Sequence, residues 1–323
     1  MRRKFFRAVA VVLSVCTTIT ATFAADFPTK PIRLVVPYPA GGSTDIAARA
    51  VADALSRRVG QTVFVENRAG AGTLIGAEAV ARSQPDGYTL LYGTNASTTT
   101  PLIVRKTQFN FQRDLAPVSL VLVAPLILLT NPDLPVHNVA ELIALLRAKP
   151  GSVNVGYPGL GTVNHLASIL FNREAGVKTE LIPYKGNAEV QQGLLRGDIK
   201  LAFDAIISSK SFVDSGKVRA LAVSSATRSS AMPELPTIAA SGLPGFEAIF
   251  WNGVLAPAGT PPEVISRLNV EFDAVVKVPE MAAKLRSLGA EPAGGSIQNF
   301  ERRISGDLDK WGRIIREMNI RAD

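Results

Sequence analysis

Cysteine and histidine are almost absent from this 323-residue chain. The single cysteine is Cys16, and the two histidines are His137 and His165. Two histidines cannot form a histidine-rich metal cluster, so we predict no metal site and no cofactor. The sequence also lacks a Gly-x-Ser-x-Gly elbow, a Walker sequence and a His-Glu-x-x-His motif. We therefore predict no catalytic residues and a protein that is not an enzyme.

Clusters of charge are missing as well. Charged residues make up 19% of the chain, hydrophobic residues make up 47%, and the formal net charge is +8. This composition is typical of a globular protein, and the length suffices for two domains. The basic residues are scattered and form no stripe interleaved with aromatic residues, so nucleic acid is not an expected partner.

The N-terminus has the pattern of a secretory signal peptide. Four basic residues open the chain, namely Arg2, Arg3, Lys4 and Arg7. A short apolar stretch, residues 8–15, and the small-residue end Thr22-Phe23-Ala24 follow. We predict a signal peptide over residues 1–24, cleaved after Ala24. A retained membrane anchor would need about 20 apolar residues, and four threonines interrupt this run.

Cys16 leaves an alternative open, because Leu13-Ser14-Val15-Cys16 resembles a bacterial lipobox. A lipobox usually has a small residue where Val15 stands. Cleavage after Ala24 would remove the only cysteine, which excludes disulfides in the mature chain. It would also remove four basic residues and leave 31 Lys and Arg against 27 Asp and Glu.

One short pattern occurs twice. Tyr38-Pro39-Ala40-Gly41-Gly42-Ser43-Thr44-Asp45 follows an apolar run, and so does Tyr157-Pro158-Gly159-Leu160-Gly161-Thr162-Val163-Asn164. Each copy precedes a helical pattern. The first N–H groups of a helix lack acceptors, and the helix dipole adds partial positive charge, so each copy is a candidate anion site. We expect Ser43 or Thr44 to cap the first helix. Together the two copies predict a clamp that closes on a small acid.

The rest of the chain alternates strands and helices, which predicts an α/β fold with parallel sheets. Strands are expected at 32–36, 62–66, 88–92, 153–156, 179–184, 199–204 and 218–224. Two apolar segments, 118–130 and 246–256, are expected to cross between two lobes around a cleft. We assign residues 25–125 and 250–323 to domain 1 and residues 126–249 to domain 2. Helices after residue 260, without new strands, should pack on domain 1.

Single residues near the strand ends add candidates with two interpretations each. His165 could touch a ligand or support the loop. Asp204 ends an apolar strand, where it could bind a ligand ammonium or hydroxyl, or only cap the backbone. Tyr38, Tyr184 and Trp251 could form apolar walls of a cleft. Residues 70–76 superficially resemble a dinucleotide fingerprint, but no acidic residue follows at the required distance, which favours a structural glycine loop.

Taken together, these motifs resemble the Bug family of extracytoplasmic solute-binding receptors, which are associated with tripartite tricarboxylate transporters. The resemblance covers the whole mature chain and rests on residues 38–45, 65–72, 85–90, 159–165 and 184–186. It implies a type II periplasmic-binding fold, a location in the periplasm, and a ligand carboxylate held between the two glycine loops.

The resemblance also implies roles for individual residues. The carboxylate clamp would comprise Ala40, Gly41, Gly42, Ser43 and Thr44 with Gly159, Leu160, Gly161 and Thr162, flanked by Tyr38 and His165. The far end of the ligand would contact Asn95, Tyr184, Gly186 and Asp204. The chain departs from the family at Ser97-Thr98-Thr99-Thr100, where histidine is frequent, and at Asp204-Ala205, where Asp-Asn is frequent. The resemblance therefore does not identify the acid.

The expected function is capture of a small carboxylate for a tripartite tricarboxylate-type transporter, by a protein that acts as a monomer. Two alternatives remain open at this point. The same receptor could signal to a membrane kinase without transport. An enzyme would need a nucleophile and a base, and only Thr162 with His165 could supply them.

Overall fold

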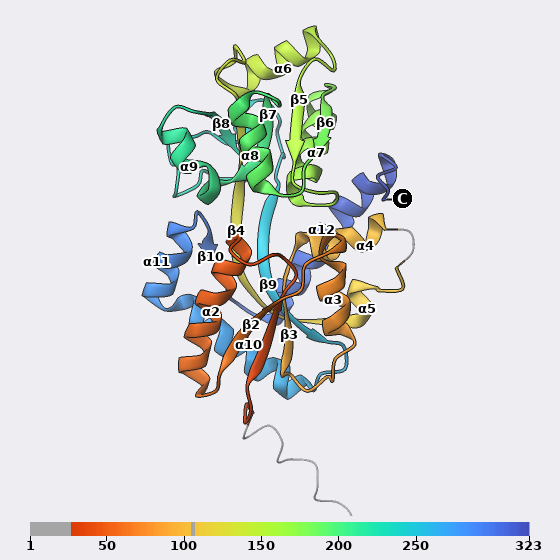
Figure 1. Ribbon diagram of the computed structural model, residues 1–323, viewed down its shortest axis with the longest axis vertical. Coiled ribbons are helices and arrows are strands. Elements are labelled where there is room, and N and C mark those ends of the chain that lie inside the picture. The colour runs from red at the N-terminus through yellow and green to blue at the C-terminus, as the bar shows by residue number, and fades with distance from the viewer. Residues whose placement is uncertain (1–26, 105–106, 323) are drawn as a thin grey trace, which may run out of the picture.

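Two lobes joined by two long strands make up the molecule (Figure 1). The computed structural model describes residues 27–104 and 107–322, so the predicted signal peptide lies outside the described residues. The joining strands are β4 (Leu115–Thr130) and β9 (Ile249–Pro257). Along the described parts of the chain, no helix combines the length and the apolar character that crossing a membrane requires. The predicted α/β two-lobe fold is confirmed.

Lobe 1 is built on a parallel sheet of β1 (Ile32–Val36), β2 (Val63–Asn67) and β3 (Thr89–Thr94). Leu34 lies opposite Val65 on one side and Leu90 on the other. Both neighbouring strands and covering helices bury β1, which explains why its sequence is apolar apart from the half-buried Arg33. The helices are α2 (Ser43–Val59), η1 (Ala71–Thr73), α3 (Leu74–Ala81), α4 (Asn95–Ile103), α5 (Phe111–Asp114), α10 (Pro262–Lys277), α11 (Pro279–Ser287) and α12 (Ile297–Glu317).

Lobe 2 repeats this plan with β5 (Asn154–Tyr157), β6 (Glu180–Pro183) and β7 (Leu201–Ala205), which run parallel. β8 (Arg219–Val223) pairs with β4. The helices are α6 (Val139–Ala148), α7 (Val163–Ala175), α8 (Asn187–Arg196), α9 (Ile206–Asp214) and η2 (Ala239–Ser241). Phe171, Phe203 and Phe246 meet in its core, and the rings of Phe203 and Phe246 stack 6.1 Å apart.

The crossing predicted for residues 118–130 is one continuous strand of 16 residues, β4. Its first part pairs with β9 as far as Pro125 opposite Ile249, and its last part pairs with β7 and β8 from Leu126 onward. Proline donates no hydrogen bond to a ladder, and Pro125 stands where β4 changes partners. The second predicted crossing is β9.

The C-terminal part differs from the expectation in two respects. A short strand, β10 (Glu291–Pro292), pairs with β4, although only helices were expected there. In addition, α12 reaches both lobes, because Trp311 and Ile315 belong to the same apolar cluster as Phe203 of lobe 2. The predicted domain boundaries at 125/126 and 249/250 stay a prediction.

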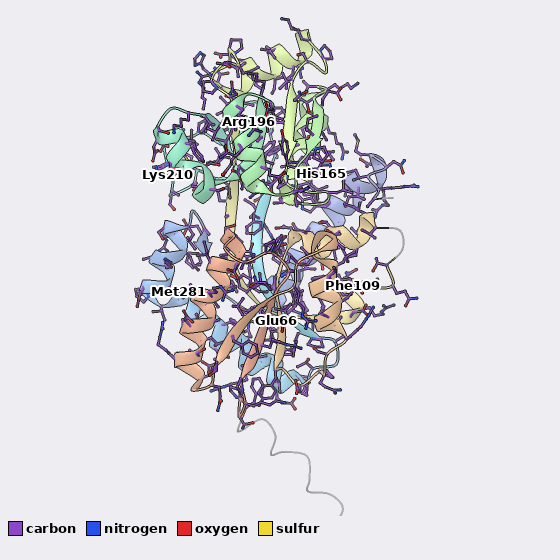
Figure 2. All side chains as sticks on the ribbon, viewed as in Figure 1. Glu66, Phe109, His165, Arg196, Lys210 and Met281 are labelled. Carbon is purple, nitrogen blue, oxygen red and sulfur yellow. The ribbon has the colours of Figure 1, made fainter. Side chains whose placement is uncertain are left out.

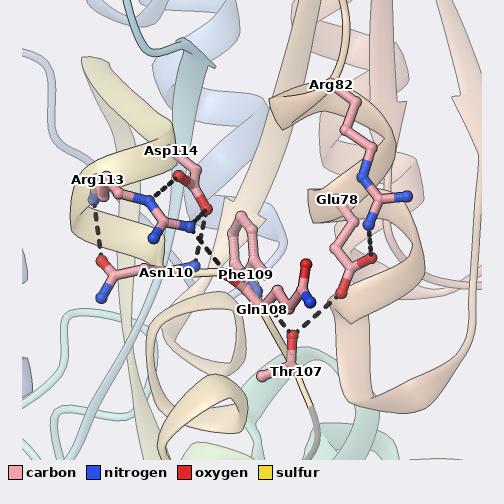
Figure 3. A network of polar contacts seen from close by, with 8 residues as sticks. All are labelled: Glu78, Arg82, Thr107, Gln108, Phe109, Asn110, Arg113 and Asp114. Atoms are coloured by element: carbon pink, nitrogen blue, oxygen red, sulfur yellow. Dashed lines mark hydrogen bonds and ion pairs between the residues drawn. The ribbon is translucent and has the colours of Figure 1, made fainter.

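Short-range polar contacts hold the segment that leads into β4 (Figure 3). The side-chain amide oxygen of Asn110 accepts the Arg113 backbone N–H at 3.0 Å and caps the start of α5. The Arg113 guanidinium donates to the Asp114 carboxylate at 2.9 Å. The Thr107 hydroxyl donates to Glu78 of α3 at 3.1 Å. These contacts attach the start of the crossing strand to lobe 1.

Candidate functional site

Six strand ends meet at the waist between the lobes. β1, β2 and β3 are parallel and end at one edge of lobe 1, and β5, β6 and β7 end at one edge of lobe 2. Thr94 at the end of β3 lies opposite Asn252, which lies opposite Leu122 of β4. Ala205 at the end of β7 lies opposite Leu126. Leu122 and Leu126 of β4 thus mark where the strands of lobe 1 and of lobe 2 end. These two positions are four residues apart along β4, or about 13 Å, a distance that suits a small ligand.

The first glycine loop is open at this edge. Ala40, Gly41, Gly42 and Ser43 are all exposed. Gly42 is the N-cap of α2, and no side chain caps the helix. The expected cap by Ser43 or Thr44 is therefore wrong. The N–H groups of the first turn have no acceptor within the helix, so this end of α2 keeps donors and partial positive charge for a ligand.

Asp45, in the first turn of α2, holds this loop through hydrogen bonds. Its carboxylate accepts the Gly41 N–H at 2.9 Å, the Arg49 guanidinium at 3.0 Å and the Asn67 amide at 2.8 Å. Asn67 also donates to the Tyr38 carbonyl at 3.0 Å. Burial acts to raise the pKa of the Asp45 carboxyl, but the hydrogen bonds from Arg49, Gly41 and Asn67 outweigh it and lower the pKa below its ordinary value. The Asp45 carboxylate thus fixes the loop through the Gly41 N–H.

The second glycine loop is more tightly bound to its own lobe. Thr162 is the N-cap of α7, and its hydroxyl donates to the Gly159 carbonyl at 2.8 Å. The Gly161 N–H donates to His165 Nδ1 at 3.3 Å. Gly161 is buried and has φ +76°. Fewer donors remain here than at the first loop, so the two copies of the motif are not equivalent as anion sites.

His165 supports this loop. Its ring packs on Tyr157 with the centroids 4.3 Å apart. Burial lowers the pKa of His165 to about 4, so the ring is neutral and its Nδ1 can accept the Gly161 N–H. Figure 2 places His165 at the end of lobe 2 that faces lobe 1. The Thr162 hydroxyl donates to a backbone carbonyl and not to this ring, so the two do not form a nucleophile–base pair.

The eighth residue of each motif has the same role. Asp45 binds Asn67 at the end of β2, and Asn164 donates to the Phe203 carbonyl of β7 at 2.8 Å. In both lobes this residue ties the start of the helix to a neighbouring strand end. Because an Asp or Asn occurs at the eighth position of both copies, this anchoring role could have been predicted from the sequence.

Three further predicted residues lie at the same strand ends. The Tyr38 hydroxyl is 2.8 Å from the Thr94 hydroxyl, and burial raises the pKa of Tyr38 to about 12 despite this hydrogen bond. Tyr184 is half-buried directly after β6, where Gly193 leaves room for its hydroxyl. Gly186 is the N-cap of α8. All three residues thus lie at the strand ends between the lobes, and their contacts with a ligand stay a prediction.

The Asn95 side chain forms hydrogen bonds inside the protein. It is fully buried, and its amide nitrogen donates to Asp307 at 2.6 Å and to the Ile249 carbonyl at 3.1 Å. Its side-chain amide oxygen accepts the Trp251 backbone N–H at 2.9 Å. The side chain of Asn95 therefore belongs to a hydrogen-bond network between α4, β9 and α12, and the ligand contact predicted for this residue stays a prediction.

Asp204 is similarly occupied. It is 1% exposed, and its carboxylate accepts from Gln191 at 2.8 Å, from Ser209 at 2.6 Å and from the Ala205 N–H at 2.8 Å. Burial raises the pKa of Asp204 although these bonds oppose the shift. Of the two interpretations of this residue, the structure shows the internal one. The ligand contact predicted for this residue stays a prediction.

Trp251 is not a wall of the waist. It is fully buried, packs edge-on against Phe300 with the ring centroids 5.2 Å apart, and donates from its indole to Asp307 at 2.7 Å. Asp307 thus holds both Asn95 and Trp251. No local pattern in the sequence indicated this carboxylate.

Two threonines of α4 were missed as parts of the site. The Thr99 hydroxyl donates to the Gly161 carbonyl at 2.7 Å, and the Thr100 hydroxyl donates to the Gly72 carbonyl at 2.8 Å. The signal was present as a row of four hydroxyl residues, 97–100, directly after the end of β3.

A separate hollow of about 400 Å³ lies between α12 and the start of β9, lined by residues that include Glu247, Arg302, Arg303, Asp307 and Lys310. It contains none of the predicted ligand residues and carries charges of both signs. The strand ends offer a better site, because parallel α/β sheets bind ligands there.

Comparison with known proteins identifies the family of this chain. Residues 47–320 match the family described as "Tripartite tricarboxylate transporter family receptor". Protein BugT of Bordetella pertussis is 37% identical over 93% of this chain and 93% of its own length.

Solved structures agree in fold. The R. palustris protein Rpa4515, solved with adipate, is 37% identical with a TM-score of 0.82 over 90% of this chain and 97% of that one. The periplasmic binding protein BugD is 31% identical with a TM-score of 0.81 over 92% of this chain and 100% of that one. The Bug resemblance is thereby confirmed, and this two-lobed chain belongs to the receptor family of the tripartite tricarboxylate transporters.

Proposed function

We propose that this receptor captures a small carboxylate in the periplasm and delivers it to a tripartite tricarboxylate-type transporter. The observation that carries the proposal is the uncapped start of α2, where Gly42 and Ser43 are exposed at the carboxyl end of β1. The family description supports the transport role, and the adipate bound by Rpa4515 supports the ligand class.

The first loop is the principal carboxylate anchor in this proposal. Its helix donors are uncommitted, whereas Thr162 already caps α7 and His165 already holds Gly161. One helix-terminus interaction contributes only about 0.3–1 kcal/mol when exposed. Useful affinity therefore requires several N–H bonds in a site that the second lobe closes against water.

Gly42 offers a sharp test. Its φ of −76° already suits proline, and an added Cβ would have 3.9 Å to its nearest neighbour. Gly42→Pro therefore removes one N–H at a position whose φ and Cβ space suit proline, and Gly42→Ala is the matched control that keeps the N–H. A thermal-shift screen of mono- and dicarboxylates, beginning with adipate, first finds a ligand. Isothermal titration should then show binding at least about tenfold weaker for Gly42→Pro, and near-normal binding for Gly42→Ala.

Equal affinities for Gly42→Pro and the unmodified protein would contradict the role of the first loop. Two further measurements, made with the ligand that the screen identifies, address the alternative functions. Turnover of a bound acid by the pure protein would favour an enzyme. Binding without uptake, in cells that carry the transporter subunits, would favour a sensor. We propose that the receptor acts as a monomer, which its molecular mass in solution tests.

A further inference from the structure

Helix α4 of lobe 1 makes a direct polar contact with the second glycine loop of lobe 2. The Thr99 hydroxyl and the Gly161 carbonyl are 2.7 Å apart, and both residues are buried. Figure 1 shows α4 at the waist, next to the lower end of lobe 2. This hydrogen bond joins two elements 62 positions apart in the sequence that belong to different lobes.

The backbone of the loop is shaped for this approach. Gly161 has φ +76°, and a Cβ on it would lie 2.9 Å from Ile103 Cδ1 and 3.4 Å from the Thr100 hydroxyl. Only glycine combines this conformation with such a close contact. The Gly161 N–H is meanwhile held by His165. The peptide groups at Gly161 are thus fixed by lobe 2 on one side and by lobe 1 on the other.

Thr99 also has a second acceptor, the Asn95 carbonyl one helical turn back, at 3.0 Å. A hydroxyl donates one hydrogen at a time. When the second glycine loop contacts α4, the Thr99 hydroxyl can donate to the Gly161 carbonyl, which is the nearer of its two acceptors. When the loop withdraws, the hydroxyl can donate to Asn95 instead, so separation leaves no unpaired donor on α4. The contact is therefore reversible, and its net contribution is that of one hydrogen bond.

We propose that Thr99 is a positioning residue that holds the second glycine loop in its ligand-facing shape from the opposite lobe. Through this hydrogen bond, the loop is held more firmly when the two lobes lie close together than when they are apart. The effect on ligand affinity rests on the proposed function, whereas the contact between the lobes does not.

The first experiment needs no ligand. Amide hydrogen exchange of the segment 157–166 should be about 2- to 12-fold faster in Thr99→Val than in the unmodified protein, which corresponds to loss of one net hydrogen bond. Thr98→Val is the matched control, because Thr98 is equally buried and, among the described residues, its hydroxyl donates to the Asn95 carbonyl alone. Thr99→Ser should restore slow exchange. Thr99→Ala serves as a second variant without the hydroxyl if Thr99→Val does not fold.

Equal exchange in the Thr99 and Thr98 variants would overturn the proposal. The second experiment measures dissociation of adipate, or of the first carboxylate that the screen identifies. Thr99→Val should dissociate by a similar factor faster, with little change in association rate. Faster exchange in a protein that binds no carboxylate would support the role of Thr99 and contradict the proposed function, so the two can fail separately.

Discussion

His165 shows how one buried side chain makes the second loop sensitive to pH. Its ring is 4% exposed, and its Nδ1 must stay unprotonated to accept the Gly161 N–H. Burial lowers its pKa from 6.5 to about 4. In the unfolded chain the same imidazole takes up a proton near pH 6.5. Acid therefore favours the unfolded state between these two values.

We expect the free energy of unfolding to fall as the pH drops from 6.5 to 4, with His165 accounting for up to about 3 kcal/mol of the loss. Urea unfolding across this range should show a shallower loss for His165→Gln. His137→Gln, at an exposed histidine, is the control and should follow the unmodified protein. Burial raises the pKa of Asp204 and Asp307, so these two carboxyls stabilise the folded state as the pH falls and oppose the effect of His165. The contribution of His165 is therefore measured as a difference between variants. Identical slopes for both histidine variants would refute this role.

At the scale of elements, Asp307 of α12 connects three parts of the fold. It accepts from Asn95 at the start of α4 and from Trp251 of β9. Both donors are fully buried and would lose their acceptor together. Helix α12 thus fixes the end of β3 against a crossing strand through one carboxylate.

Asp307→Ala should lower the free energy of unfolding by about 2–4 kcal/mol, because two buried donors are left without partners. Asp307→Asn should cost less, since an amide oxygen in the same place can still accept both bonds. Asp309→Ala, at an exposed position of the same helix, is the control and should stay within about 0.5 kcal/mol. Urea unfolding measures all three. A similar loss for the Ala and Asn variants of Asp307 would show that the hydrogen bonds are not the reason.

For the whole molecule, the N-terminal prediction can be tested by one measurement of the exported protein. If the signal peptide is cleaved after Ala24, the intact mass corresponds to a chain that begins at Ala25. A thiol reagent then leaves it unlabelled, because Cys16 is the only cysteine. A mature chain that began at Cys16 and carried lipid, or a full-length chain in the membrane fraction, would contradict this cleavage.

Much of the fold was predictable because its signals are local. The apolar run of β1 and the glycine turn before α2 lie within a few residues of each other, and their repetition marked the second lobe. The internal partners of Asn95 and Asp204 were not predicted, because they come from other elements of the fold. The partner of Asn95, Asp307, lies 212 positions away, and the partners of Asp204 come from the two helices on either side of its strand. Whether a polar side chain faces a ligand or a buried partner depends on contacts that only the folded chain creates.

The two crossing strands also restrict how the lobes can move. β4 and β9 are extended, and nine residue pairs join them side by side. A strand residue already spans about 3.3 Å, close to the roughly 3.3–3.6 Å that a fully stretched backbone allows. The connection is therefore nearly inextensible: a mechanical load that drew the lobes apart along it would act on two covalent backbones in parallel. Bending and twisting of this ribbon remain available, so the lobes can swing and rotate about the waist but cannot separate along it.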